Sequence, residues 1–166
     1  MSQAALLENQ KGYPNGKVDY DHTKSIDIGD GVNKDYIIHY DEDGFPDFTK
    51  HCPGNNYVFT ASDLKGDAGS SSDILRANKA MKQHFGNTTS DNFIWDGSSN
   101  NFSIRNTKPD GTVYEVKYTW HHHQDCNTMF PVPTRIHSSN SGGFQHSGGA
   151  KLIVDDLRNV FDPPIF

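Results

Sequence analysis

Residues 119–137, TWHHHQDCNTMFPVPTRIH, place three adjacent histidines directly after a tryptophan and a fourth histidine at position 137. The alternating segment 111–120 predicts a strand that ends at these histidines. The run QDCN is typical of a turn and TMFPVP of a second, short extended segment. Pro133 and Thr134 then open a short helix that carries His137. The stretch therefore predicts a β-hairpin followed by a helix, with histidines at the end of one strand and on the helix.

The histidines indicate a metal site. Five of the nine histidines in the chain lie between residues 121 and 146. Neutral imidazole is the commonest protein ligand for zinc and similar metals, and imidazoles that leave open positions on the metal are typical of a catalytic site. An unligated histidine, with an ordinary pKa near ~6.5, can accept a proton from water. From the residues alone, a structural metal site and a solvated strand end without a ligand remain as alternatives.

The direction of each imidazole depends on where the first strand ends. On a regular strand neighbouring side chains point to opposite faces, so His121 and His123 would share one side and His122 would take the other. If the strand ends or bends at Trp120, adjacent imidazoles instead converge on one site. Trp120 itself is expected to be an anchor in the core beneath the site.

The whole chain is predicted to be one loop-rich α+β domain with a small core, because only 33% of its 166 residues are hydrophobic and it contains 15 Gly and 8 Pro. Residues 1–30 are expected to be a loosely ordered lead-in to a single domain at 31–166. Cys52 and Cys126 lack CxxC spacing, which excludes a zinc ribbon and favours two free thiols over a disulfide. No run approaches the ~20 apolar residues of a membrane span, and the N-terminus lacks the features of a signal peptide. We therefore expect no membrane contact and no cleaved leader.

Beyond the hairpin, the pattern predicts one clear helix and several strands. Ser71 or Ser72 caps the helix, Gly86 stops it, and the helix carries an apolar stripe. The members of the stripe are Ile74, Leu75, Ala77, Ala80, Met81 and Phe85. Further strands are expected at 35–40, 56–61 and 92–106, and a last helix or strand at 148–161.

The Trp-His-His run, the Val-Pro and Ile-His that follow it, and His-Ser-Gly-Gly at 146–149 resemble the WHH-type toxin nucleases of the HNH/endonuclease VII (His-Me finger) superfamily. Upstream, GFPDF at 44–48 and DILRAN at 73–78 resemble two further elements of that family. The resemblance therefore spans roughly residues 44–150. It implies a small domain built around a ββα-metal motif, with this core at about 112–150.

The resemblance also implies a role for each histidine. His121, His137 and His146 are the expected ligands of one divalent metal ion, which is Zn, Mg, Mn or Ni; for His146 the alternative is a contact to phosphate. His122 is the expected general base, and His123 is either the alternative base or a supporting residue.

Two departures from the family pattern affect this assignment. MFPVP replaces Met-Gln-Leu-Val-Pro, which removes a glutamine amide. SSNSGGFQ at 138–145 is a small insertion, and it lengthens the path to His146. Asp73 and Asn78 lie on the helix of the upstream match and are possible supporting residues.

The activity that the resemblance implies is that of a metal-dependent endonuclease, which hydrolyses the phosphodiester bonds of DNA with little sequence specificity. The implied setting is the toxic C-terminal domain of a secreted antibacterial effector. Such a domain acts in the cytoplasm of a target bacterium, and an immunity protein holds it in check in the producer. Two alternatives stay open: a metal-dependent RNase of the same fold, and a non-catalytic, zinc-stabilised protein-binding module.

The charge of the chain argues for a local nucleic-acid surface. The net charge is −6, whereas non-specific affinity for nucleic acids comes largely from Lys and Arg against phosphates. The acidic excess lies mainly in the first half of the chain. Arg105, Lys117 and Arg135 lie in the half that carries the histidines, and we expect them to bind substrate from a basic rim.

Overall fold

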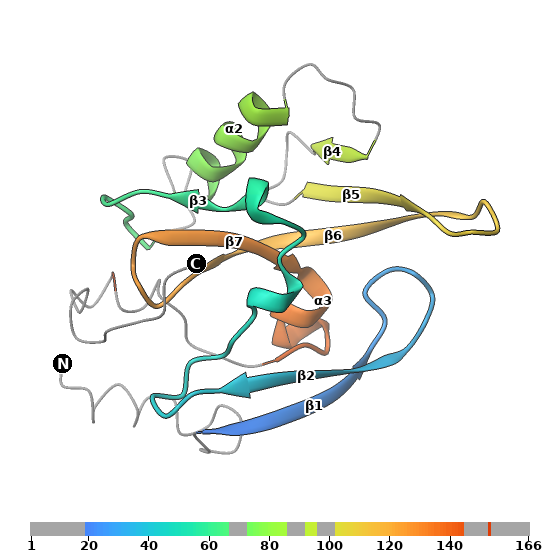
Figure 1. The fold of residues 1–166 in the computed structure, drawn as a ribbon, viewed down its shortest axis with the longest axis horizontal. Helices are drawn as coiled ribbons and strands as arrows, with labels where there is room; N and C mark the ends of the chain where they lie inside the picture. Colours follow the sequence, from blue (N-terminus) through green and yellow to red (C-terminus); the bar gives the residue numbers. More distant parts are fainter. Residues whose placement is uncertain (1–18, 67–72, 86–91, 96–101, 145–152, 154–166) are drawn as a thin grey trace.

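A computed structural model of the chain describes residues 19–66, 73–85, 92–95, 102–144 and 153. These residues contain a five-stranded antiparallel sheet of order β3-β7-β6-β5-β4 and a separate two-stranded ribbon of β1 and β2 (Figure 1). The strands are β1 Tyr20–Ile26, β2 Lys34–Tyr40, β3 Phe59–Thr60, β4 Phe93–Trp95, β5 Phe102–Thr107, β6 Val113–His122 and β7 Thr128–Pro133. The helices are α2 Asp73–Phe85 and α3 Thr134–His137, with 3-10 turns η1 Thr49–His51, η2 Asn55–Tyr57 and η3 Ser139–Ser141. The α+β class predicted from the sequence is confirmed.

The predicted hairpin is present, and its first strand is the central strand of the sheet. β6 runs two residues past the alternative end at Trp120 and includes His121 and His122. It pairs with β7 so that His121 lies opposite Phe130 and His122 opposite Met129. α3 follows β7 directly, so strand, strand and helix occur in the predicted order.

Pro131 lies within β7, although proline disfavours the interior of a central strand. Its partner on β6 is Trp120, while β3 pairs with β7 only at Thr128 and Met129. Among the described strands, β7 therefore has one neighbour where the proline lies. The missing N–H of Pro131 therefore removes no backbone hydrogen bond between β7 and β3.

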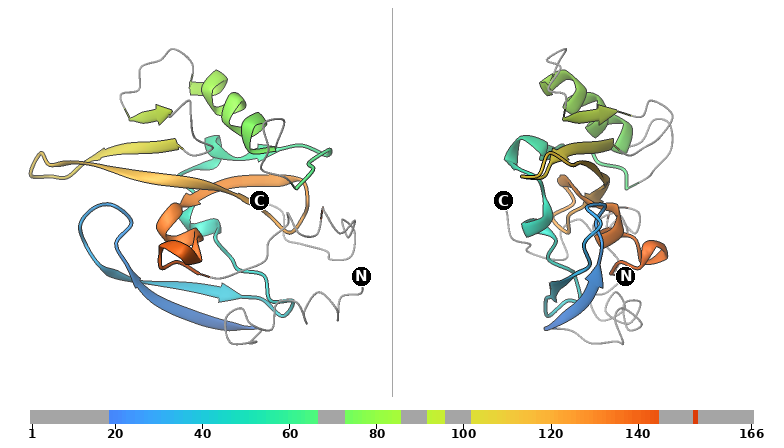
Figure 2. Two further views of the ribbon diagram at one scale, coloured as in Figure 1. Left: turned by 180° about the vertical axis from the view of Figure 1, so that it is seen from behind. Right: turned by 90° about the vertical axis from the view of Figure 1, so that its right-hand side faces the viewer.

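The two faces of the sheet carry separate cores. On one face, Val116, Tyr118 and Trp120 of β6 pack with α2. On the other face, Phe130 and Val132 of β7 pack with α3 and with the inner side chains of the β1–β2 ribbon. Figure 2 shows α2 on one side of the sheet and α3 with the ribbon on the other. The sheet thus lies between two different layers, and alternate residues of β6 face different surroundings.

The predicted helix is α2, and Ala77 and Met81 of its apolar stripe are buried. Leu75 is 43% exposed, because it lies off the helical face that these two residues define. The predicted capping residues of α2 lie outside the described residues. The same holds for the element expected at 148–161, except for Ile153, which is helical and buried.

β1 lies within the segment 1–30 that we expected to be a loosely ordered lead-in; residues 1–18 are outside the described part of the chain. β1 pairs with β2 along its whole length, from Tyr20 with Tyr40 to Ile26 with Lys34. Its inward positions include a histidine and a lysine. Such polar residues remove the apolar alternation by which a half-buried strand is identified in a sequence.

Cys52 and Cys126 are both free cysteines, as expected from their spacing. Cys126 is buried in the turn between β6 and β7, and Cys52 is partly buried after η1. In the described part of the chain, no helix has the length and apolar character needed to cross a membrane.

Candidate active site

Two histidines meet where the hairpin joins α3. Nδ1 of His121, near the end of β6, lies 3.3 Å from Nε2 of His137, the last residue of α3. The two ring centroids are 5.4 Å apart, with an interplanar angle of 72°. His121 is 3% exposed, whereas His137 is only partly buried. One imidazole is therefore enclosed by protein, and its partner faces the surface.

Two aromatic rings hold this histidine pair. Phe48, the last residue of the GFPDF run, is fully buried, and its ring centroid lies 5.1 Å from that of His121 and 5.7 Å from that of His137. Phe130, the β7 partner of His121, contacts the same imidazole with a centroid distance of 5.2 Å. Both contacts of His121 are edge to face, which favours one orientation of its ring, whereas the Phe48 ring is tilted against that of His137. The sequence resemblance marked the GFPDF run only as a matching element, and its contacts now give it a structural role at the site.

A hydrogen bond attaches the turn that leads into the GFPDF run to the loop after β6. The Nε2 amide of Gln124 donates to Oδ2 of Asp41 over 2.9 Å. The other oxygen of Asp41 accepts the backbone N–H groups of Asp43 and Phe45, each over 2.9 Å. The turn that precedes Phe48 is therefore fixed to the hairpin that carries the histidines.

His122 has a different partner on the opposite face of β6. Its Nε2 lies 2.9 Å from Oδ2 of Asp73, the first residue of α2. The two side chains are 8% and 0% exposed. A buried carboxylate is stable only when it is paired or hydrogen bonded, and this pairing meets that condition.

Its surroundings keep the Asp73 carboxylate ionised. Burial raises the pKa of Asp73, but the backbone N–H groups of Lys65 and Gly66 and the imidazole of His122 together hold it below the usual range. Lys65 N–H donates over 2.9 Å and Gly66 N–H over 2.7 Å, and Arg76 adds an ion pair at 3.7 Å. An ionised carboxylate only accepts hydrogen bonds, so Nε2 of His122 is the donor. In the neutral imidazole, the lone pair then lies on Nδ1.

Trp120 and Asn78 make a second link between β6 and α2. The indole N–H of Trp120 donates to Oδ1 of Asn78 over 2.6 Å, and both side chains are buried. Trp120 and His122 lie two residues apart on the same face of β6, so both bonds attach this face to α2. Trp120 is a core anchor, as expected, and Asn78 contributes by holding that anchor.

The neighbouring histidines diverge, because β6 continues through His122 and does not end at Trp120. His121 faces α3, and His122 faces α2. His123, the first residue after β6, is 4% exposed, and its ring centroid lies 6.1 Å from that of Phe130, the residue that also contacts His121. The structure therefore brings His121 and His137 together and directs His122 to a separate partner.

The inserted segment after α3 folds back onto the helix. The backbone N–H of Phe144 donates to the carbonyl of Ile136 over 2.9 Å. Gly143 permits this close approach, because a Cβ at that position would collide with the backbone oxygen of Ile136. The insertion is thus looped out, and the chain is beside α3 again two residues before His146. His146 itself lies outside the described residues.

The described residues supply two donors for a metal ion. Nitrogens that bind one tetrahedral cation at ~2.0–2.1 Å lie about 3.4 Å apart, and the 3.3 Å between the His121 and His137 nitrogens fits this spacing. Within the described ranges, no third histidine, cysteine or carboxylate completes a metal-binding group. Imidazole nitrogen suits zinc, nickel and related divalent metals.

The three expected substrate contacts differ in their partners. Arg105 and Lys117 lie on the face of the sheet that also carries His121, and Arg105 forms a 3.2 Å ion pair there with Glu115. Lys117 is exposed, and it has no ion pair among the described residues. Arg135 of α3 is also exposed, and it donates over 3.4 Å to a backbone carbonyl in the loop between β1 and β2. The backbone N–H groups of Gly29 and Gly31 and the guanidinium of Arg135 hold the pKa of the Asp27 carboxyl below its usual range, so Arg135 shares its charge with a carboxylate. Lys117 is therefore the best placed of the three to offer net positive charge.

A family model for the DNase/tRNase domain of colicin-like bacteriocins matches residues 38–148, about two thirds of the chain. The matched segment begins within β2 and includes α2, the β6–β7 hairpin and α3. It therefore contains both the His121–His137 pair and the His122–Asp73 pair. No curated protein matches the chain.

Proposed function

Because the chain belongs to the family of DNase/tRNase domains of colicin-like bacteriocins, we propose that this nuclease domain is a metal-dependent endonuclease of the HNH (His-Me finger) type that hydrolyses DNA. The observation that carries the proposal is the pair of imidazole nitrogens 3.3 Å apart where the β6–β7 hairpin meets α3. The order of strand, strand and helix around this pair supports a ββα-metal core. The Trp-His-His run supports the WHH type within that superfamily.

In this proposal His121, His137 and His146 bind one divalent ion, which is Zn, Mg, Mn or Ni. The spacing of the first two nitrogens supports their part in the site. The hydrogen bond from Phe144 to Ile136 supports the third ligand, because it returns the chain to α3 just before residue 146. When bound, the ion supplies positive charge that stabilises the phosphoryl oxygen and the leaving oxygen.

His122 is the general base in this proposal. Asp73 accepts the Nε2–H of His122, which fixes the tautomer and leaves Nδ1 able to take a proton from water. His122 and the His121–His137 pair lie on opposite faces of β6, and β6 ends at His122, so the proposal puts the attacking water at the end of this strand, between the two faces. His123 is the second candidate for the base, since it lies on the same side of the hairpin as His121.

The reaction is an in-line displacement at phosphorus. Nδ1 of His122 takes a proton from the attacking water while the water oxygen bonds to phosphorus. The bond from phosphorus to the 3′ oxygen breaks, and this oxygen leaves with the electron pair and takes a proton from solvent to become the 3′ hydroxyl. Lys117 and Arg135 bind neighbouring phosphates. Contacts of this kind go to the backbone and carry no sequence information, so the enzyme has little sequence specificity.

The bacteriocin family supports a toxin that acts on nucleic acid inside a target bacterium. We propose that the domain is the toxic, C-terminal part of a secreted antibacterial effector. A cognate immunity protein neutralises it in the producing cell.

A cleavage assay with supercoiled plasmid and with tRNA tests the activity. After treatment with EDTA, the protein is expected to nick plasmid when Mg²⁺, Mn²⁺, Ni²⁺ or Zn²⁺ is restored. His122→Ala should lower the rate by roughly 10²–10⁴-fold, whereas His84→Ala, an exposed histidine on α2, should leave it unchanged. A matching loss in His123→Ala, with His122→Ala active, would identify His123 as the base.

The substrates separate the alternatives. Cleavage of tRNA but not of plasmid would identify an RNase. A folded protein that cuts neither substrate with any of the four metals would reject the nuclease mechanism in favour of a non-catalytic module.

A further inference from the structure

Lys24 lies on the inner face of β1, where a charged side chain is uncommon. Inner positions alternate with exposed ones along this strand, and Ile26 at its end is buried in the core beside α3. Lys24 is partly buried, and its register partner on β2 is the buried Tyr36. Lysine is tolerated at such a position when its apolar stem packs and its ammonium reaches a polar group. The ammonium of Lys24 is therefore expected to reach a polar group at the edge of this core.

The ammonium of Lys24 reaches the chain segment that follows α3. Its Nζ atom donates to the carbonyl of Gly143 over 2.8 Å and lies 5.8 Å from the centroid of the Phe144 ring. The N–H of Gly143 in turn donates to the carbonyl of Ser138, the residue directly after His137. Lys24 thus places a cation on the same short backbone loop that begins at one of the proposed metal ligands.

The charge of Lys24 is not neutralised by a carboxylate among the described residues. Its acceptor is a neutral carbonyl, which occupies one of the three N–H donors of an ammonium group. Two other cations are compensated: Arg76 pairs with Asp63 at 2.7 Å, and Arg105 pairs with Glu115 at 3.2 Å. Lys24 therefore keeps both net charge and free donors.

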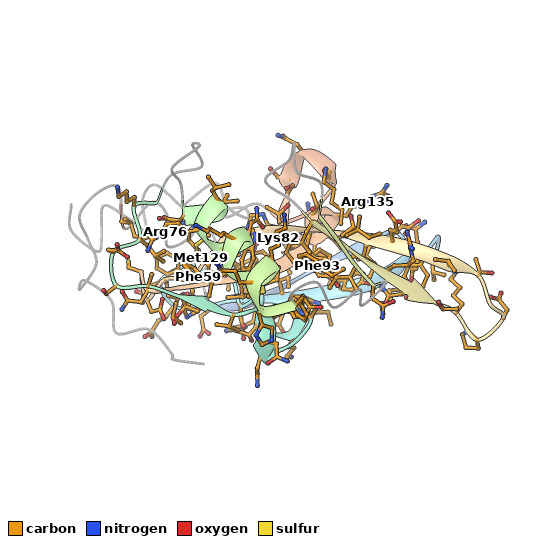
Figure 3. All side chains as sticks on the ribbon, turned by 90° about the horizontal axis from the view of Figure 1, so that it is seen from above. Phe59, Arg76, Lys82, Phe93, Met129 and Arg135 are labelled. Carbon is orange, nitrogen blue, oxygen red and sulfur yellow. The ribbon has the colours of Figure 1, made fainter. Side chains whose placement is uncertain are left out.

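Cations lie on both sides of the sheet, and Lys24 is one of those on the side of the proposed metal ligands. Lys24, on β1, and Arg135, on α3, belong to the layer that covers the face of the sheet carrying His121. Arg76 and Lys82 lie on α2, which covers the other face of the sheet (Figure 3). Lys24 thus offers a charge without a carboxylate partner in the described part of the chain, on the side of the proposed metal ligands.

We propose that Lys24 contacts a phosphate of the nucleic-acid backbone next to the bond that is cut. This rests on the proposed function and adds to it a contact from β1, which precedes the family-matched segment 38–148. A compact ammonium with unused donors suits a phosphate oxygen, and binding does not require the bond to Gly143 to break. The β1–β2 ribbon is then part of the substrate surface.

Fluorescence anisotropy with a short labelled DNA duplex, in EDTA and at several salt concentrations, tests the proposal. Lys24→Met keeps the apolar stem and removes the charge. It should weaken binding roughly fivefold and lower the slope of log affinity against log salt by about one. Lys24→Arg should retain both values. Lys79→Gln, an equal loss of charge at an exposed position on α2, is the matched control and should behave as wild type.

Each other result overturns the proposal. An unchanged slope in Lys24→Met excludes the phosphate contact, and the nuclease assignment stands if plasmid is still cut. A loss in Lys24→Arg equal to that in Lys24→Met would assign the effect to packing on Phe144. An equal loss in Lys79→Gln would put the duplex on the α2 face. Thermal melting shows whether each variant is folded. If Lys24→Met does not fold, Lys24→Gln takes its place in the assay. A wild type that neither binds duplex nor cuts plasmid removes this proposal and the proposed function together.

Discussion

His121 and His122 are neighbours in the chain, yet one meets an imidazole nitrogen and the other a carboxylate oxygen. Two imidazole nitrogens at this spacing suit a shared cation. An imidazole paired with a buried carboxylate is oriented, and its proton is confined to one nitrogen, which suits proton transfer. The alternation of a single strand thus gives two identical side chains different chemistry.

Asp73→Asn is expected to lower the rate of plasmid cleavage by roughly 100-fold, because an amide no longer fixes the proton on Nε2 of His122. Initial rates at saturating metal measure the effect. Asp63→Asn is the matched control, since Asp63 is an exposed carboxylate that pairs with Arg76. Equal rates for wild type and Asp73→Asn would mean that proton transfer by His122 does not depend on the Asp73 carboxylate.

Asp73 also makes stability depend on pH. Its pKa is lower in the folded protein than the ordinary value of about 3.9, so its stabilising contribution is present above that value and is lost as the pH falls through the folded pKa. The free energy of unfolding of the wild type should therefore decrease between about pH 5 and pH 3. Asp73→Asn should be less stable at neutral pH but lose less over the same interval. Urea unfolding at each pH measures both proteins, and parallel losses would contradict the prediction.

At the scale of elements, α3 is a single turn of four residues, which is too short to be stable alone. The hydroxyl groups of Thr134 and Thr119 lie 2.8 Å apart and link α3 to β6. The bond from Phe144 to Ile136 holds its other side. The position of His137 therefore depends on contacts from β6 and from the segment after α3.

Gly143→Ala should destabilise the fold by roughly 1–3 kcal/mol, because its Cβ would collide with the backbone of α3, which cannot move without disturbing β6. The carbonyl of Arg135 lies 2.7 Å from that Cβ position. Gly54→Ala is the control, since its backbone is extended and the new Cβ meets only Tyr57 at an ordinary 3.7 Å. Urea unfolding compares the three proteins. A Gly143→Ala variant as stable as Gly54→Ala would mean that this segment is not packed on α3.

The hairpin, α2 and α3 could be predicted because each has a local signal, such as alternation, a helical stripe or a helix-opening Pro-Thr. The contact between Asp73 and His122 could not, since periodicity does not report which elements pack together. The same is true of Phe48, which is distant in sequence from both histidines that it contacts. The continuation of β6 past Trp120 depends on pairing with β7, which is also a non-local interaction.

At the scale of the whole molecule, a net charge of −6 is compatible with a nucleic-acid surface because the charges are unevenly paired. Among the described residues, Arg105 is compensated by Glu115, while Lys24 and Lys117 have no carboxylate partner. The sheet separates a face covered by α2 from a face that carries the His121–His137 pair. Because the proposed metal ligands lie on the second face, substrate affinity should depend on the cations of that side.

A divalent ion bound at the His121–His137 pair should stabilise the whole fold, because its ligands belong to β6 and α3. A ligand that binds only the native state at 100 times its Kd adds about 2.7 kcal/mol to the free energy of unfolding. After EDTA treatment, adding Zn²⁺ or Ni²⁺ should raise the Tm of the wild type and of His84→Ala, the exposed control on α2, but not that of His137→Ala. Thermal melting followed by circular dichroism measures the shift. A rise that persists in His137→Ala would put the bound metal elsewhere, and no rise with any of the four divalent metals would remove the ion from the mechanism.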